Sequence, residues 1–104
     1  MQTYQLQNFV YNTQPFANAI FVIASYTVIP GTSLEVNTYV YESQAFLDNN
    51  LGALSFTQYY FTADGANGSA YSDAITANAA TVYTALCGHP AAQTLLAGST
   101  FTGN

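Results

Sequence analysis

Cys87 and His89 are the side chains best suited to chemistry, because a thiol and an imidazole can act as nucleophile and base or as metal ligands. The chain has one Cys and one His, so the further ligands of a structural zinc site are missing and an internal disulfide is excluded. Residues two apart do not face each other along a helix, so a catalytic pair would need a turn at Gly88. We therefore predict structural roles, with Cys87 packed and His89 at a helix end.

The carboxylates are the next candidates for chemistry, and they are dispersed: Glu35, Glu42, Asp48, Asp64 and Asp73. Only Glu35 and Glu42 suggest a pair, and their odd separation places them on opposite faces of a strand. A two-carboxylate glycosidase would have to take its carboxylates from different elements, which no pattern indicates. Residues 64–69 (DGANGS) offer oxygen ligands like those of a calcium loop, but Ala66 occupies an expected ligand position. We predict a turn there, and no catalytic site, metal or cofactor.

Asn67-Gly68-Ser69 matches the acceptor pattern for an N-linked glycan. The pattern is short and often occurs by chance, and it matters only in a secreted eukaryotic or archaeal protein. A glycan at Asn67 is the one modification that the sequence suggests.

The chain has no Lys and no Arg, and its formal net charge is −5. Binding to nucleic acid or anionic lipid depends on Lys and Arg that neutralise phosphates, so both partners are excluded. Schiff-base lysines and arginine clamps for phosphate are absent for the same reason. The surface must consist of neutral polar groups, which guard strand edges poorly and favour packing between copies of the chain. A soluble secreted monomer, kept apart by its five acids, is the alternative.

Nine Tyr and seven Phe in 104 residues are the second unusual feature. Aromatic side chains on strands most often form cores and cross-strand pairs, but tyrosine is also favoured at protein interfaces. We predict that aromatic and apolar side chains of three predicted strands form the interface between subunits: Tyr4, Leu6, Phe9, Val10, Tyr39, Tyr41, Tyr59 and Phe61. A carbohydrate-binding surface is the alternative.

Four segments have the patterns of strands. Residues 3–11 alternate with one apolar face, which indicates a strand, or an extended arm over residues 1–12 that completes the sheet of a neighbour. Residues 19–29 are apolar almost without alternation, as expected for a central strand covered on both faces. After a Pro-Gly turn, residues 34–41 alternate cleanly and predict its hairpin partner, and residues 53–62 predict the fourth strand.

The second half of the chain has helical spacing instead. A longer helix is predicted from the recurrence of Tyr71, Ile75, Asn78, Val82 and Leu86. Gly88 suits its C-terminal end, and Pro90 suits the first turn of a short helix through residue 97. The sequence thus predicts one α+β domain over residues 1–104, with a small antiparallel sheet of about four strands followed by one longer and one short helix.

These observations predict a structural protein rather than an enzyme. The neutral surface, the aromatic residues and the β-rich first half indicate a subunit that assembles with itself, through neutral interfaces and strand exchange, into an extracellular filament, sheath or viral coat. Its expected location is extracellular or on the surface of a particle. The alternative is a small secreted binding domain, similar to a lectin, that takes a neutral ligand.

Overall fold

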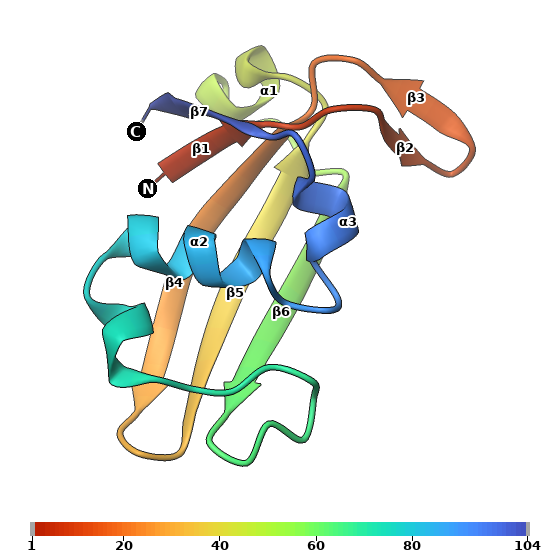
Figure 1. Cartoon of the computed structure of the whole chain (residues 1–104). Coiled ribbons are helices and arrows are strands. Elements are labelled where there is room, and N and C mark those ends of the chain that lie inside the picture. Colours follow the sequence, from red (N-terminus) through yellow and green to blue (C-terminus); the bar gives the residue numbers. More distant parts are fainter. Residues whose placement is uncertain (1, 104) are drawn as a thin grey trace.

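The computed structural model describes residues 2–103, which form an α+β fold (Figure 1). Five antiparallel strands form one sheet in the order β6-β5-β4-β1-β7. The elements of this sheet and of the chain around it are β1 (Gln2–Gln5), β2 (Phe9–Tyr11), β3 (Gln14–Phe16), β4 (Ile20–Ile29), β5 (Ser33–Tyr41), α1 (Gln44–Asp48), β6 (Ser55–Thr62), the 3₁₀ helix η1 (Asp73–Thr76), α2 (Ala79–Cys87), α3 (Gln93–Leu96) and β7 (Thr100–Gly103). Helices α2 and α3 lie on one face of the sheet, and β2 and β3 form a separate hairpin.

β4 is the central strand, as its apolar sequence predicts, and it pairs with β5 in an antiparallel hairpin. A bulge between Ile23 and Ser25 shifts the positions that face the core, so that Phe21 and Ile23 point inward before it and Tyr26 and Val28 after it. The first four residues of β4 are buried on both faces, whereas in the second half Tyr26 and Val28 are only partly buried on the core side and the residues between them are exposed on the other. Cover on both faces is therefore confirmed only for the half of β4 beside β1.

The N-terminal segment is not the single strand or arm that residues 3–11 predict. β1 lies inside the sheet, where it pairs with β4 on one side and with β7 on the other. Asn8 then adopts a positive φ of 56°, which turns the chain away from the sheet. Apolar alternation continues across this bend, and for this reason the sequence pattern reads as one strand.

A two-residue turn at Asn12 and Thr13 joins β2 to β3. Both residues have positive φ, 50° and 65°, as a type I′ hairpin turn requires. The hairpin projects from one end of the molecule (Figure 1). Its short strands and its turn without glycine give little sequence signal, and it was not predicted.

The predicted longer helix is two shorter pieces, η1 and α2. The side-chain oxygen of Asn78 accepts a hydrogen bond from the Thr81 N–H, and the Asn78 N–H donates to the Thr81 hydroxyl oxygen, a capping box that starts α2 at Ala79. The helical spacing had placed Asn78 inside the helix, where it would form part of a continuous stripe. The short strand β7 after α3 was also missed, and with it the fifth strand of the sheet.

The core lies between the sheet and α2 with α3. Val82 and Leu86 of α2 and Leu96 of α3 are buried against sheet residues such as Phe21 and Val36. In the described part of the chain, no helix has both the length and the apolar character needed to cross a membrane.

Candidate functional site

Four of the eight predicted interface residues belong to the core of the chain itself: Tyr4, Leu6, Tyr59 and Phe61. Tyr4, Tyr59 and Phe61 on their strands, and Leu6 directly after β1, pack in the core cluster with α2 and α3, so their side chains are not available at a surface of this fold. The interface prediction is corrected for these four residues. It failed because alternation shows that a strand has two faces but does not show which face the helices will cover.

The other four residues lie on two separate surfaces. Val10 is 57% exposed on the projecting hairpin, and Phe9 is half-buried beside it. Tyr39 and Tyr41 are half-buried on β5, on the face of the sheet opposite α2 and α3. We call this second surface the open face, and its role as an interface stays a prediction.

Aromatic rings gather at one end of the open face. The ring of Tyr39 lies 5.0 Å from that of Phe56 on β6 and 6.2 Å from that of Tyr41, measured between centroids. Phe56 is 54% exposed, and the sequence prediction did not include it. Its position opposite Tyr39 in the β5–β6 register brings it into the cluster.

A row of polar side chains crosses the open face beside this cluster. Asn37 on β5 donates to the Ser25 hydroxyl on β4 at 3.0 Å, and Gln58 on β6 donates to the Asn37 carbonyl oxygen at 2.7 Å. Tyr60 completes the row by donating to Gln58. Each amide keeps one further N–H for a partner, because an NH₂ group has two donors and the row uses one. The open face thus combines exposed aromatic rings with neutral donors.

His89 is buried between the sheet and the helices, and both of its ring nitrogens have partners. The N–H of Ala91 donates to Nδ1 at 3.0 Å, so Nδ1 carries no proton and Nε2–H donates to the carbonyl oxygen of Tyr60 at 2.8 Å. The rings of Phe61 and Tyr59 meet the imidazole edge to face. His89 is therefore a neutral structural side chain that fastens the turn after α2 to β6.

The prediction that Cys87 is packed is wrong, because Cys87 is exposed at the end of α2. The short helix places residues 82 and 86 inward, which turns residue 87 towards solvent. Within residues 2–103, no three His, Cys, Asp or Glu side chains come close enough together to hold a metal ion.

Residues 64–69 form a turn, as their sequence predicts. The Asp64 carboxylate accepts from the N–H of Ala66 at 3.0 Å, and this hydrogen bond is the main reason that the pKa of Asp64 lies below its usual value. Asn67 is exposed, but its side-chain nitrogen donates to the carbonyl oxygen of Tyr60. A glycan on Asn67 would have to replace this hydrogen bond, and the glycan stays a prediction.

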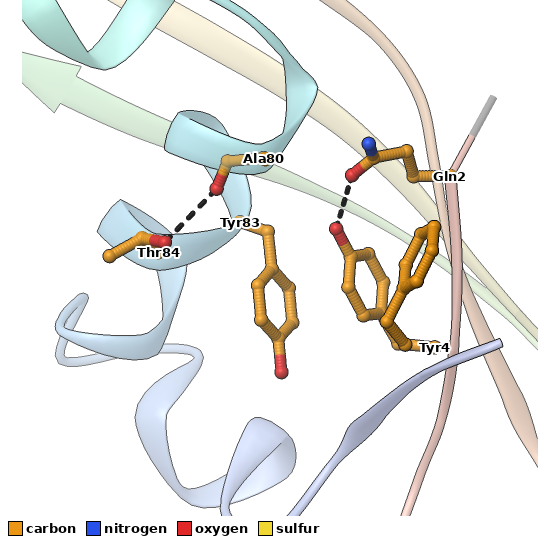
Figure 2. A pocket seen from close by; sticks show the side chains of 6 residues that line it. Gln2, Tyr4, Ala80, Tyr83 and Thr84 are labelled. Carbon is orange, nitrogen blue, oxygen red and sulfur yellow. Dashed lines mark hydrogen bonds between the residues drawn. The ribbon is translucent and has the colours of Figure 1, made fainter. Parts of the chain in front are cut away.

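A shallow pocket of about 280 Å³ lies between β1, β7 and α2 (Figure 2). The rings of Tyr4 and Tyr83 stack with centroids 3.7 Å apart, and Tyr4 donates to the Gln2 side-chain oxygen. Phe101, which is 58% exposed, forms another wall. Binding sites for small molecules usually start at about 300 Å³, so the pocket suits one inserted side chain better than a cofactor.

Comparison of the chain with family models, curated proteins and solved structures gives no match. The function must therefore be argued from the geometry of the chain itself.

Proposed function

We propose that the chain is a structural subunit that assembles with copies of itself, through neutral and aromatic-rich surfaces, into an extracellular filament, sheath or viral coat. One observation carries this proposal. Large apolar side chains are more than two-fifths exposed on three separate parts of a cation-free surface, namely Val10 on the hairpin, Phe56 and Tyr60 on the open face, and Phe101 at the pocket.

Isolated apolar residues are normal on protein surfaces, and what distinguishes these three parts is their surroundings. In most proteins Lys and Arg separate exposed apolar groups and oppose contact between copies. Here only five carboxylates do so, and none of them lies on β2, β3, β6 or β7. Glu35 on β5 lies opposite Tyr60, but contact through the hairpin, β7 or the Phe56 end of β6 brings no side chain of these elements that is ionised against the second copy, which reduces the unfavourable desolvation of charge.

Contacts at several separate places allow a subunit to bind more than one neighbour. Unlike a single patch, which closes a dimer, two different surfaces generate rings or open filaments. The arrangement of the exposed residues therefore supports an extended assembly.

A second candidate function is binding of a neutral carbohydrate on the open face. The specific observation that favours it is the polar row of Asn37 and Gln58 beside Tyr39 and Phe56, which offers free amide donors next to rings on which a sugar can stack. In that case the chain is a secreted lectin-like domain.

Sedimentation velocity over a wide range of protein concentration, with negative-stain imaging of the same samples, separates the two functions. A structural subunit gives particles or filaments that grow with concentration and do not respond to sugars. A lectin-like domain stays a monomer or small oligomer and shifts only when neutral glycans are added. Monomers at every concentration would exclude the assembly proposal.

A further inference from the structure

β6 is an edge strand of the sheet, so one row of its backbone groups points away from β5. The hydrogen bonds of Tyr60 and Thr62 show which residues of β6 point their backbone groups away from β5. The Tyr60 carbonyl accepts from His89, and the N–H and carbonyl of Thr62 pair with Ser69 and Tyr71, which lie outside the sheet. Because successive residues of a strand point in opposite directions, Phe56 and Gln58 direct their backbone groups to the same outer side.

The outer edge is covered at one end of β6 only. At Tyr60 and Thr62 the groups are occupied by His89, Asn67 and the loop that follows β6. In the described part of the chain, residues 2–103, no loop or helix forms a hydrogen bond with the outward groups of Phe56 or Gln58. Unpaired groups of this kind form a template for another strand.

Three consecutive residues at this uncovered end are exposed: Phe56, Thr57 and Gln58. Since neighbours on a strand face opposite sides of the sheet, neither side is covered here. The segment also has no charge, no proline and no bulge in its register with β5. It therefore lacks the charges, prolines and bulges by which many proteins prevent pairing at a strand edge.

We infer that the uncovered edge of β6 pairs with the same edge of a second copy, antiparallel and centred on Thr57. Phe56 then lies opposite Gln58 of the second copy, and Gln58 lies opposite Phe56 of the second copy. Both residues point their backbone groups outward, so each pair exchanges two N–H···O bonds. The inference rests on the proposed function, because it names one contact by which copies of the chain assemble.

A second copy fits this edge better than an unrelated strand does. The uncovered groups are symmetric about Thr57, which is what a two-fold axis between identical strands requires. The pairing is antiparallel, like every other pair in the sheet. It also joins two five-stranded sheets into one, and it brings the exposed ring of Phe56 against the neutral side chain of Gln58 from the other copy.

Replacing Phe56 by lysine tests the pairing. The Phe56→Lys variant places two ammonium groups close to the two-fold axis, where charged side chains block edge pairing. We expect the dissociation constant for the β6 contact to rise at least about tenfold, measured by sedimentation equilibrium. Ile29→Lys is the matched control. Ile29 is also a large apolar residue and is 48% exposed, but it lies at the end of β4, which is not an edge strand, so this variant should associate like the parent.

Amide hydrogen exchange gives a second, direct measurement. In the parent protein the amides of Phe56 and Gln58 should exchange more slowly as protein concentration rises, and in Phe56→Lys this dependence should vanish. Gln58→Pro removes an outward N–H without removing a hydrogen bond to β5, and it should have the same effect if Phe56→Lys does not fold. Parent protein that assembles with fast-exchanging amides at both positions would overturn the edge pairing and leave the proposed function standing. Parent protein that never associates would overturn both.

Discussion

Two isoleucines on β4 differ in how much stability the fold would lose if a charged residue replaced them. Ile23 is buried in the core cluster, whereas Ile29 is 48% exposed at the far end of the same strand. We expect Ile23→Asp to reduce the free energy of unfolding by about 4 kcal/mol or more, because the chain has no Lys or Arg to pair with a buried carboxylate.

Ile29→Asp is the control for this variant, and it should lie within about 1 kcal/mol of the parent. Urea unfolding followed by circular dichroism measures both. Equal unfolding midpoints for the two variants would show that Ile23 is not buried in solution.

Tyr4 predicts how stability depends on alkaline pH. Burial, followed by the neighbouring Tyr83 and Cys87, raises the pKa of Tyr4 from its usual value of 10.0 to about 12. A raised pKa favours the neutral phenol in the folded state, so its contribution to stability is complete below pH 10 and is lost as the pH rises towards 12. We expect the urea midpoint to fall across this window.

Tyr4→Phe keeps the stacked ring but removes the titrating hydroxyl and its hydrogen bond to Gln2. Its stability at neutral pH should drop by about 1 kcal/mol, and its decline between pH 10 and 12 should be shallower than in the parent. An identical alkaline decline in both proteins would assign it to other tyrosines, of which Tyr59, Tyr71 and Tyr83 also have raised pKa values.

At the scale of elements, the position of β1 determines what an N-terminal deletion does. If residues 1–12 were an arm on a neighbour, their removal would leave folded monomers. β1 instead lies between β4 and β7 and contributes the buried side chain of Tyr4. Removing residues 1–12 should therefore unfold the chain, because β7 loses its partner in the sheet and β4 loses one of its two.

Circular dichroism and a thermal melt of the shortened chain check this expectation. A cooperative melt with a native-like spectrum would contradict the interior position of β1. Val10→Ser, a change on the exposed hairpin, is the matched control and should leave the melting temperature almost unchanged.

The elements that could be predicted from sequence are those with long and regular patterns. β4 and β5 have ten and nine residues, and the clean alternation of β5 indicates its buried face directly. The missed elements depend on single residues or distant partners. Asn8 divides one apparent strand into two, and Asn78 starts a helix where the spacing predicts its middle.

The candidate site was predictable in part for the same reason. Tyr39 and Tyr41 could be placed on a surface because they alternate with buried Val40. The uncovered edge at Phe56 could not be found, since it depends on which residues of β6 the distant His89 and Asn67 cover. Sequence patterns report the faces of a strand, but they do not report its edges.

At the scale of the whole molecule, five carboxylates without any cation predict an unusual response to pH and salt. Protonation of the carboxylates brings the net charge from −5 towards a small positive value, and it relieves repulsion between copies. Assembly should therefore persist or strengthen at about pH 3–4, and moderate salt should promote it by screening. Light scattering and imaging across pH and salt concentration measure this.

Asp64 limits this acid stability only slightly. The pKa of Asp64 is lowered in the folded state, so its contribution to the stability of the fold is present above the pKa of the unfolded chain and is lost as the pH falls through the folded-state pKa. Because the carboxylate is fully exposed, this contribution is small. Particles that dissolve on acidification, or on addition of salt at neutral pH, would show that attractive charge contacts hold the copies together.

The pairing of β1 with β7 also constrains how the chain folds. Thr3 donates a hydrogen bond to the Gly103 carbonyl, so the sheet joins residues that are 100 positions apart. Closing a chain segment of this length costs about 4 kcal/mol in entropy, and folds dominated by such distant pairings fold slowly. During synthesis, β1 can pair with β4 long before residues 100–103 leave the ribosome. For that interval the side of β1 that β7 later covers is a second unpaired edge, and it exists only in unfinished chains.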